Sequence, residues 1–439
     1  MTARFPLHHL SRALRFTSKH WRMRVVFWGG ALTVGLVSIA FAELANYAQA
    51  LFQHVLVHPW LALIITPAGF FASAFIARKV FPGSEGSGIP QAIAARRFRD
   101  QRTRERLLSL RLTFGKILLT LFGLLCGASI GREGPTVQVG AAIMLYTARA
   151  GGMGLERGLI LAGSAAGVAA AFNTPLAGIV FAIEEMSRAF EQRTSGLVLI
   201  AVILAGLASL GIVGNYNYFG SASGMLHGDK DWLAVIVCGV AGGLGGGGFA
   251  RIVVWATDRL REYIAPDPMR RALTVAGICG LTVAICGVLS GGATYGTGYD
   301  AARHAVEGHH LIWSFSPLKF IATVASTLSG IPGGLFAPSL SVGAGLGSVI
   351  GQILGVHAIG AVVVLGMAGY FAGVVQAPIT AFVIIEEMTN ANGMVIPLMI
   401  ASFIGYGISQ MIQREALYHA LADGFYHSLM AKKPVEEAI

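Results

Sequence analysis

The sequence predicts an all-α polytopic membrane protein. Of its 439 residues, 54% are hydrophobic and only 12% are charged, whereas an average soluble protein has about 25% charged residues. Phe320–Ile385 contains no Asp, Glu, Lys or Arg, and Val25–Ala77 contains only Glu43. A soluble fold cannot bury such long apolar runs, whereas a helix of about 20 apolar residues spans a bilayer. The 58 glycines are typical of closely packed and interrupted membrane helices.

The positive charge of the chain indicates its orientation in the membrane. The net charge is +10, and the basic residues concentrate in Arg4–Arg24 and Arg96–Arg111. Short basic segments mark the cytoplasmic side of a membrane protein. Two predicted spans, Val25–Val57 and Trp60–Ala77, lie between the clusters, so both clusters can face the cytoplasm. This distribution gives no reason to expect a nucleic-acid partner.

We expect a single transmembrane domain at residues 25–431, between a basic cytoplasmic helix at 1–24 and a cytoplasmic tail at 432–439. Its first half covers about 25–215, its second half about 230–412, and an amphipathic helix follows at 414–431. Many segments are too short to span a bilayer straight, which is typical of tilted and re-entrant helices. The further apolar segments are Leu112–Ser129, Thr136–Ala148, Glu156–Ala171, Pro175–Phe190, Leu197–Val213, Trp232–Thr257, Leu273–Leu289, Pro317–Ser329, Ala337–Ile353, Gly360–Val374, Pro378–Met388 and Met394–Ile412. Arg259–Arg271 is expected to be a connector, and Tyr295–His310 a polar segment.

Gly131-Arg132-Glu133-Gly134-Pro135 places an arginine and a glutamate between two apolar runs. A charge at membrane depth costs on the order of 3 kcal/mol on insertion scales, so such residues usually face a water-filled path. Proline suits the first turn of a helix, and the glycines leave backbone N–H groups open. The segment therefore predicts a helix start that binds an anion. Glu133 could occupy that site when ionised and leave it when protonated; an ordinary helix start in an interfacial loop is the alternative.

The chain contains an internal repeat with a constant shift of 203 residues. The shift aligns Gly131, Pro135, Val139, Gly140 and Ala141 with Gly334, Pro338, Val342, Gly343 and Ala344, and Pro175 and Glu184 with Pro378 and Glu387. Both halves end in an apolar helix that begins with proline and carries Glu-Glu-Met. Transporters are often built from two such halves, with the binding site between them.

Two further helix starts have the same construction. Gly333-Gly334-Leu335-Phe336-Ala337-Pro338 carries Phe336 where the first half has Glu133, so it offers N–H groups without an internal acid. Gly86-Ser87-Gly88-Ile89-Pro90 adds a hydroxyl. We expect the three helix starts to converge and replace the hydration shell of one small anion.

The segments GSGIP at 86–90, GREGP at 131–135 and GLFAP at 334–338 resemble, in order and spacing, the three signature segments of the CLC chloride channel and transporter family. The resemblance covers about Val25 to Ala431. It implies a fold of about 18 helices in two inverted repeats, and a homodimer with one pore in each subunit.

Carried over by position, the resemblance implies an anion site and a gate. Ser87 and Tyr418 would donate hydroxyls to a central chloride, and Leu335 and Phe336 would donate backbone N–H groups. Glu133 would be the gate that takes up a proton. The remaining candidates near the anion are Gly88, Ile89, Arg132 and Gly134.

The residue type at position 185 distinguishes exchangers from channels within the family. The resemblance places Glu185 at the inner proton glutamate of the exchangers, where family channels carry an apolar residue. This favours secondary chloride/proton antiport over the alternative, a passive CLC-type chloride channel. Glu184 is a further candidate for the proton pathway, in which it would orient Glu185. A structural alternative for Glu185 is an ion pair with Arg188 one turn on.

The resemblance also implies the setting of the protein. Ser87 favours chloride over nitrate and argues against the fluoride-exporting branch. The chain ends 21 residues after Tyr418, so we expect no regulatory nucleotide-binding domains and a prokaryotic inner-membrane location with both termini cytoplasmic. Chloride is the expected substrate, and neither a cofactor nor an enzymatic activity is expected.

The remaining sequence features point to structure. The four cysteines, at 126, 238, 279 and 286, have no metal-ligand spacing, so no metal site is expected. Gly127–Gly131 matches a serine nucleophile motif around Ser129, but it continues an apolar helix and lacks the strand that this motif needs. The hydrolase hypothesis would also need a partner histidine at depth, and only His357 lies in a late apolar run. Lys116 either offsets the charge of the anion at a distance or snorkels to the cytoplasmic face.

Overall fold

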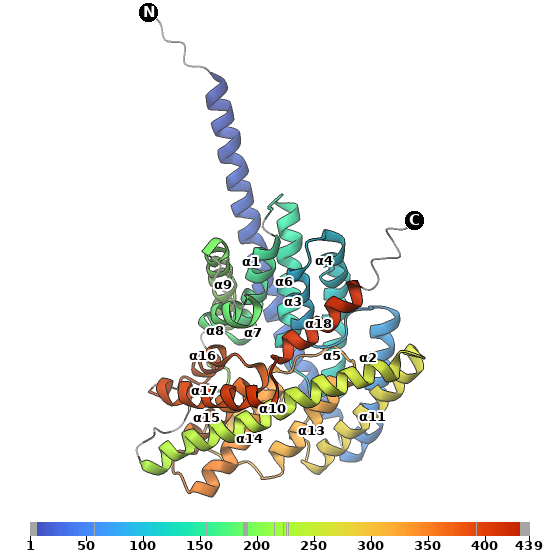
Figure 1. Cartoon of the computed structure of the whole chain (residues 1–439), viewed down its shortest axis with the longest axis vertical. Coiled ribbons are helices and arrows are strands. Elements are labelled where there is room, and N and C mark those ends of the chain that lie inside the picture. The colour runs from blue at the N-terminus through green and yellow to red at the C-terminus, as the bar shows by residue number, and fades with distance from the viewer. Residues whose placement is uncertain are drawn as a thin grey trace, which may run out of the picture.

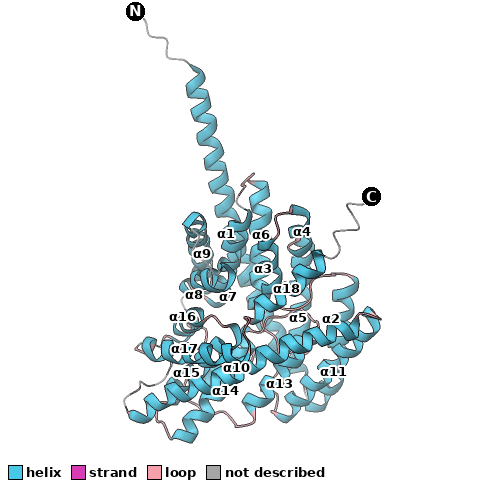
Figure 2. Cartoon of the chain, viewed as in Figure 1, coloured by secondary structure: helices cyan, strands magenta, loops and turns pink. Residues whose placement is uncertain are grey.

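The computed structural model describes residues 7–56, 58–154, 156–187, 192–214, 216–222, 224, 226, 228–391 and 393–430. Within these ranges the chain is helical with no extended strand (Figure 2), which confirms the predicted all-α fold. Among the described residues, eight helices are long and apolar enough to cross a bilayer. The predicted tail at 432–439 and Arg188, the suggested partner of Glu185, lie outside the described residues.

In the described part of the first half there are nine α-helices and two short segments of other helix types. Figure 1 shows α1 projecting beyond the other helices at its amino-terminal end. The elements are α1 (Leu7–Val55), a 3-10 turn (Pro59–Leu61), α2 (Ala62–Lys79), α3 (Ile89–Arg97), α4 (Gln101–Leu107), α5 (Leu110–Leu125), α6 (Glu133–Ala150), α7 (Glu156–Phe172), α8 (Pro175–Phe181), a π-helix (Ala182–Ser187) and α9 (Gln192–Val213).

The second half repeats this plan. Its elements are α10 (Asp229–Ile264), α11 (Pro268–Leu289), α12 (Tyr299–Val306), α13 (Phe315–Leu328), α14 (Phe336–Leu354), α15 (Ile359–Val375), α16 (Pro378–Thr389) and α17 (Val395–Ile412), followed by α18 (Leu417–Met430). The shift of 203 residues aligns the first residue of α6 with that of α14, of α7 with that of α15, of α8 with that of α16, and of α9 with that of α17.

Several boundaries differ from those expected. No helix break occurs at residue 24, because α1 continues from the basic segment through the first span. The connector expected at 259–271 is shorter, since α10 extends to Ile264 and Pro268 begins α11. Two short helices were not predicted, and one of them, α12, lies in the segment expected only to be polar. The α4 helix begins where the Asp100 side chain accepts hydrogen bonds from Arg102 N and Thr103 N, and α12 begins after Gly298 in the left-handed region.

Glycines set the contact between neighbouring helices in both halves. A Cβ on Gly163 of α7 would lie 2.2 Å from the carbonyl oxygen of Gly140 on α6. In the second half, a Cβ on Gly343 of α14 would lie 2.8 Å from the carbonyl oxygen of Gly366 on α15. These four positions are related by the repeat shift. The backbones approach so closely that only glycine fits, as in other closely packed membrane helices.

This contact predicts a large difference between two glycine-to-alanine substitutions. Gly163→Ala should destabilise the protein by about 2 kcal/mol or more, because the added methyl meets a backbone atom that cannot move aside. Gly248→Ala in α10 is the matched control. A Cβ there meets nothing within 4 Å, and alanine favours the helix. Thermal unfolding midpoints of both purified variants would test this, and equal midpoints would contradict it.

Candidate functional site

Two interrupted helices begin at one point. The N–H of Gly131 donates to the carbonyl oxygen of Gly334 at 2.7 Å, and the N–H of Gly334 donates to the carbonyl oxygen of Gly131 at 2.7 Å. A Cβ on Gly334 would lie 2.8 Å from the backbone nitrogen of Gly134, so the close approach requires glycine. The reciprocal pair brings the starts of α6 and α14 together, and the positive ends of two helix dipoles meet there.

The loop before α3 joins this junction. The N–H of Gly86 donates to the carbonyl oxygen of Ile331 and the N–H of Gly333 donates to that of Gly86, both at 3.3 Å. A Cβ on Gly134 would lie 2.6 Å from Oγ of Ser87, which places the Ser87 hydroxyl against the first turn of α6. The structure therefore brings the three helix starts together.

The same loop is held by a buried lysine. Lys116 is wholly buried, and its Nζ donates to the carbonyl oxygens of Glu85 and Gly86 at 3.2 and 2.8 Å. The snorkelling alternative is thus wrong, because the ammonium does not reach a surface. Lys319 lies one repeat shift later and is also wholly buried. Its Nζ donates to the carbonyl oxygens of Thr294 and Gly296 at 2.9 and 2.7 Å.

Tyr418 completes the group of candidate anion ligands. It lies in the first turn of α18, is wholly buried, and its ring centroid is 5.8 Å from that of Phe336. The Tyr418 and Ser87 hydroxyls lie within hydrogen-bonding range of each other, but within the described part of the chain neither completes a hydrogen bond of good geometry. Leu335 and Phe336 are buried beside them. The N–H of Gly88 is already used, since it donates to Oε1 of Gln91 at 3.1 Å.

Glu133 is wholly buried in the first turn of α6. Its carboxylate lies near the backbone N–H groups of Arg132 and Ala337, but neither oxygen completes a hydrogen bond among the described residues. A buried polar group without a partner costs about 1–3 kcal/mol. The two hydroxyls and the helix starts are donors without acceptors, so this arrangement fits a small anion.

Glu185 lies in the π-helix, is 2% exposed, and is close enough to Tyr418 for its charge to act on that hydroxyl. Nε2 of His419 lies 2.8 Å from the Glu185 carbonyl oxygen and 3.9 Å from its Oε1. Arg97 at the end of α3 lies 3.1 Å from Nδ1 of the same histidine and pairs with Asp423. A neutral imidazole with its proton on Nε2 satisfies both ring nitrogens.

This network ties three elements together: α3, which follows the Ser87 loop, α18, which carries Tyr418, and the π-helix. A second arginine of α3, Arg96, donates to the carbonyl oxygen of Met186. Sequence reasoning missed His419 and Arg97. The only local signal for His419 is that it follows Tyr418.

Comparisons with known proteins agree with this geometry. The family model described as voltage gated chloride channel matches residues 68–410. The chain belongs to this family, the CLC family. Solved structures with the same fold include a slow cyanobacterial Cl⁻/H⁺ antiporter, with a TM-score of 0.79 and 22% identity over 92% of this chain and 98% of that one. A CLC-type fluoride/proton antiporter has a TM-score of 0.76 and 23% identity, covering 91% and 97% of the two chains. A eukaryotic CLC transporter has a TM-score of 0.76 and 22% identity, covering 92% of this chain and 74% of that one.

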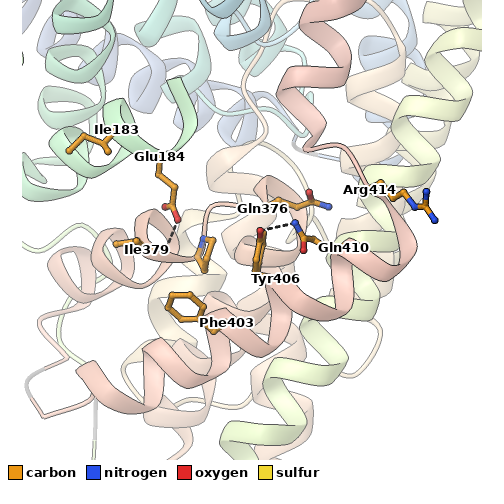
Figure 3. Close-up of a pocket in the computed structure, with 9 residues that line it drawn as sticks. Ile183, Glu184, Gln376, Ile379, Phe403, Tyr406, Gln410 and Arg414 are labelled. Carbon is orange, nitrogen blue, oxygen red and sulfur yellow. Dashed lines mark hydrogen bonds between the residues drawn. The ribbon is translucent and has the colours of Figure 1, made fainter. Parts of the chain in front are cut away.

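In this CLC protein Glu184 acts as a helix cap. Its carboxylate accepts hydrogen bonds from the N–H groups of Ile379 at 3.1 Å and Thr380 at 2.6 Å, at the start of α16. Figure 3 shows the Glu184 side chain pointing at this helix from the edge of a pocket. The repeat partner, Glu387, accepts from Leu176 and Ala177 at the start of α8, at 3.0 and 2.7 Å. Each half thus caps a helix of the other.

The hydrolase hypothesis finds no support at Ser129. Its hydroxyl lies 3.1 Å from that of Thr323, and its N–H donates to Oγ of Ser326. His357 is an exposed residue in the turn between α14 and α15.

The two buried lysines predict local effects on hydrogen exchange. Lys116→Met removes one donor from each of two part-buried carbonyls, which keep only the Gln91 side chain and the Gly333 N–H as donors, so we expect amide exchange over residues 86–91 to rise about tenfold. Lys319→Met is the matched control in the other repeat and should accelerate residues 296–301 instead. Hydrogen-exchange mass spectrometry measures both segments. Equal acceleration of both segments in either variant would indicate global loosening and contradict the local role.

Proposed function

We propose that the protein is a secondary active chloride/proton antiporter. The observation that carries the proposal is the position of Glu133, a buried acid in the first turn of a helix whose start converges with two others. Its carboxylate lies where open backbone N–H groups attract negative charge. A chloride ion and the ionised carboxylate are alternative occupants of such a position.

Competition for one position couples the two ions. When Glu133 is ionised, it fills the outer part of the anion path and blocks a chloride. When it takes up a proton, its attraction to the helix dipoles falls and it yields to chloride. Ser87 and Tyr418 would hold the central chloride with their hydroxyls, Leu335 and Phe336 with backbone N–H groups, and Gly88, Ile89, Arg132 and Gly134 would line the path.

Glu185 supports antiport rather than passive conduction. It is an acid inside the protein, beside His419 and close enough to Tyr418 for its charge to act on that hydroxyl, and there it can receive a proton from the cytoplasmic side. A channel has no need of a proton acceptor at this depth, and burial of an acid there is costly. Glu184 would hold the π-helix in register through its bonds to α16.

We also propose the wider setting. The basic residues at the amino end of α1 and in Arg96–Arg111 favour that face as the cytoplasmic one, with both termini on this side. We propose a homodimer in a prokaryotic inner membrane, with one pore in each subunit. Chloride is the proposed substrate, with no cofactor and no enzymatic activity.

Replacement of the gate should separate the two fluxes. In vesicles containing the purified protein, an imposed chloride gradient should drive protons uphill. Glu133→Ala should reduce proton movement to the level of protein-free vesicles yet leave chloride flux, because the anion path loses its movable block. Chloride and proton electrodes in one sample measure both. Glu262→Ala, at an exposed position of α10, is the control; persistent proton pumping in Glu133→Ala would make the gate assignment wrong.

Replacement of the inner acid should uncouple the protein in a similar way. Glu185→Val removes the proposed proton acceptor without touching the anion ligands, so proton flux should fall to background while chloride flux continues. The proton-to-chloride ratio in the same assay tests this. An unchanged ratio would remove Glu185 from the pathway. A wild-type chloride current whose reversal potential ignores pH would instead identify a channel.

A further inference from the structure

A polar pocket of about 440 Å³ lies beside Arg132, next to the start of α6. The α1 and α6 helices run antiparallel, because Arg22 donates to Ala150 at one end and Arg132 to Asn46 at the other. Gln49 also lines the pocket and lies further along α1 than Asn46. The pocket, which we call the vestibule, is therefore at the face opposite the amino end of α1. In the proposed topology this is the outer face.

One wall of the vestibule is an inverted-repeat copy of the Ser87 loop. Gly296-Thr297-Gly298 precedes α12 as Gly86-Ser87-Gly88 precedes α3. All four glycines have positive φ, at 62° and 75° in the first loop and 70° and 103° in the second. The loops are held by the paired lysines described above. Thr297 thus corresponds to Ser87 as a hydroxyl at the start of a short helix.

Two further residues that line the vestibule have counterparts among the candidate ligands of the central anion. With the shift of 203 residues, Arg132 in the first half is the equivalent of Leu335 in the second half. Tyr218 follows the end of α9 by five residues, much as Tyr418 follows the end of α17 by six. The Arg132 guanidinium lies 5.7 Å from the Tyr218 ring centroid. Burial raises the pKa of Tyr218, so its phenol keeps its proton.

Arg132 provides an independent sign of a ligand. It is 3% exposed and lines the vestibule. Its Nη1 donates to Ala42 and Asn46, but its Nε has no hydrogen-bond partner within the part of the chain that the structure describes. A buried guanidinium with an unused donor is unfavourable unless a ligand completes it.

We propose that the vestibule is a second anion site, which takes a halide between the outer solution and Glu133. Its donors are the Thr297 hydroxyl, the Tyr218 hydroxyl and the Arg132 guanidinium. In the present structure the hydroxyl and the backbone N–H of Thr297 donate to an acceptor within the protein. Oε1 of Gln49 accepts from the Thr297 N–H and hydroxyl, both at 3.1 Å. The amide oxygen of Gln49 therefore stands where a halide would bind.

Two carboxylates in the vestibule weaken its affinity for an anion. Glu43 and Asp300 also line it, and their negative charges oppose an anion. The site is thus suited to rapid transit rather than to storage, since an anion held tightly at the entrance would slow transport. Gln49 has the same effect, because it competes for two of the donors.

Bromide soaks test the site directly, since bromide replaces chloride and scatters anomalously. This inference rests on the proposed function, but the two can fail separately. In crystals of Gln49→Ala, we expect one anomalous peak beside Ser87 and Tyr418, and a second beside Thr297 and Arg132. A central peak with an empty vestibule would overturn the vestibule site alone. A vestibule peak without a central one would overturn the proposed central site, and no peak in either place would overturn both.

A transport measurement supports the structural one. Thr297→Val should raise the half-saturating chloride concentration on the outer side about fivefold, the loss expected for one hydrogen bond to the ion. Thr297→Ser keeps the hydroxyl and should match the wild type. In vesicles the protein inserts in both orientations. Modifying a cysteine introduced on one face blocks the molecules of one orientation, so that chloride affinity can be measured on each side separately. Equal shifts on both sides, or equal effects of Val and Ser, would contradict a hydroxyl that binds anions at the outer entrance.

Discussion

The fold depends on the reciprocal backbone pair between Gly131 and Gly334. A helix that begins inside a membrane leaves its first N–H groups without partners, which is costly in a low-dielectric setting. Here two such starts share the cost. Each glycine satisfies the N–H and carbonyl of the other at 2.7 Å, while the N–H groups that follow stay available to an anion. The pair is symmetric, so it also marks the axis that relates the two halves.

Other interactions repeat across this axis and hold the halves as one unit. Glu184 and Glu387 each cap a proline-started helix of the opposite half, where a carboxylate is favoured by the helix dipole. Lys116 and Lys319 each hold a glycine-rich loop by two carbonyls. Buried charges are normally unfavourable. Here the buried lysines bond loop carbonyls, and the half-buried glutamates accept from the first N–H groups of interrupted helices.

The sequence predicted the parts of this architecture that leave a local signature. The apolar runs predicted the helical class, and the constant shift predicted that Gly131 and Gly334 are equivalent. The Ser87, Glu133 and Phe336 segments were expected to converge, and the structure brings them together. Their roles in transport stay predictions.

Other features depend on contacts between distant residues and could not be predicted. The correspondence between the Thr297 loop and the Ser87 loop was not predicted. Thr297 lies 210 residues after Ser87, whereas the repeat was identified from a constant shift of 203. His419 and Arg97 meet only through the docking of α18 on α3. The burial of Lys116 could not be predicted either. A lysine within an apolar run has the same sequence pattern whether its ammonium reaches the membrane surface or turns into the protein.

Glu133 and Phe336 occupy equivalent places in the repeat, yet their surroundings are opposite. The Phe336 ring packs against four other rings, with centroids 4.9 Å away at Phe371, 5.8 Å at Tyr418, 5.9 Å at Phe181 and 6.3 Å at Phe172. Moving it would break these contacts, so the Phe336 side chain is held in place. Glu133 makes no hydrogen bond through its carboxylate among the described residues, so mainly its charge holds it in place. A proton removes that charge, and of these two side chains only Glu133 can take one up.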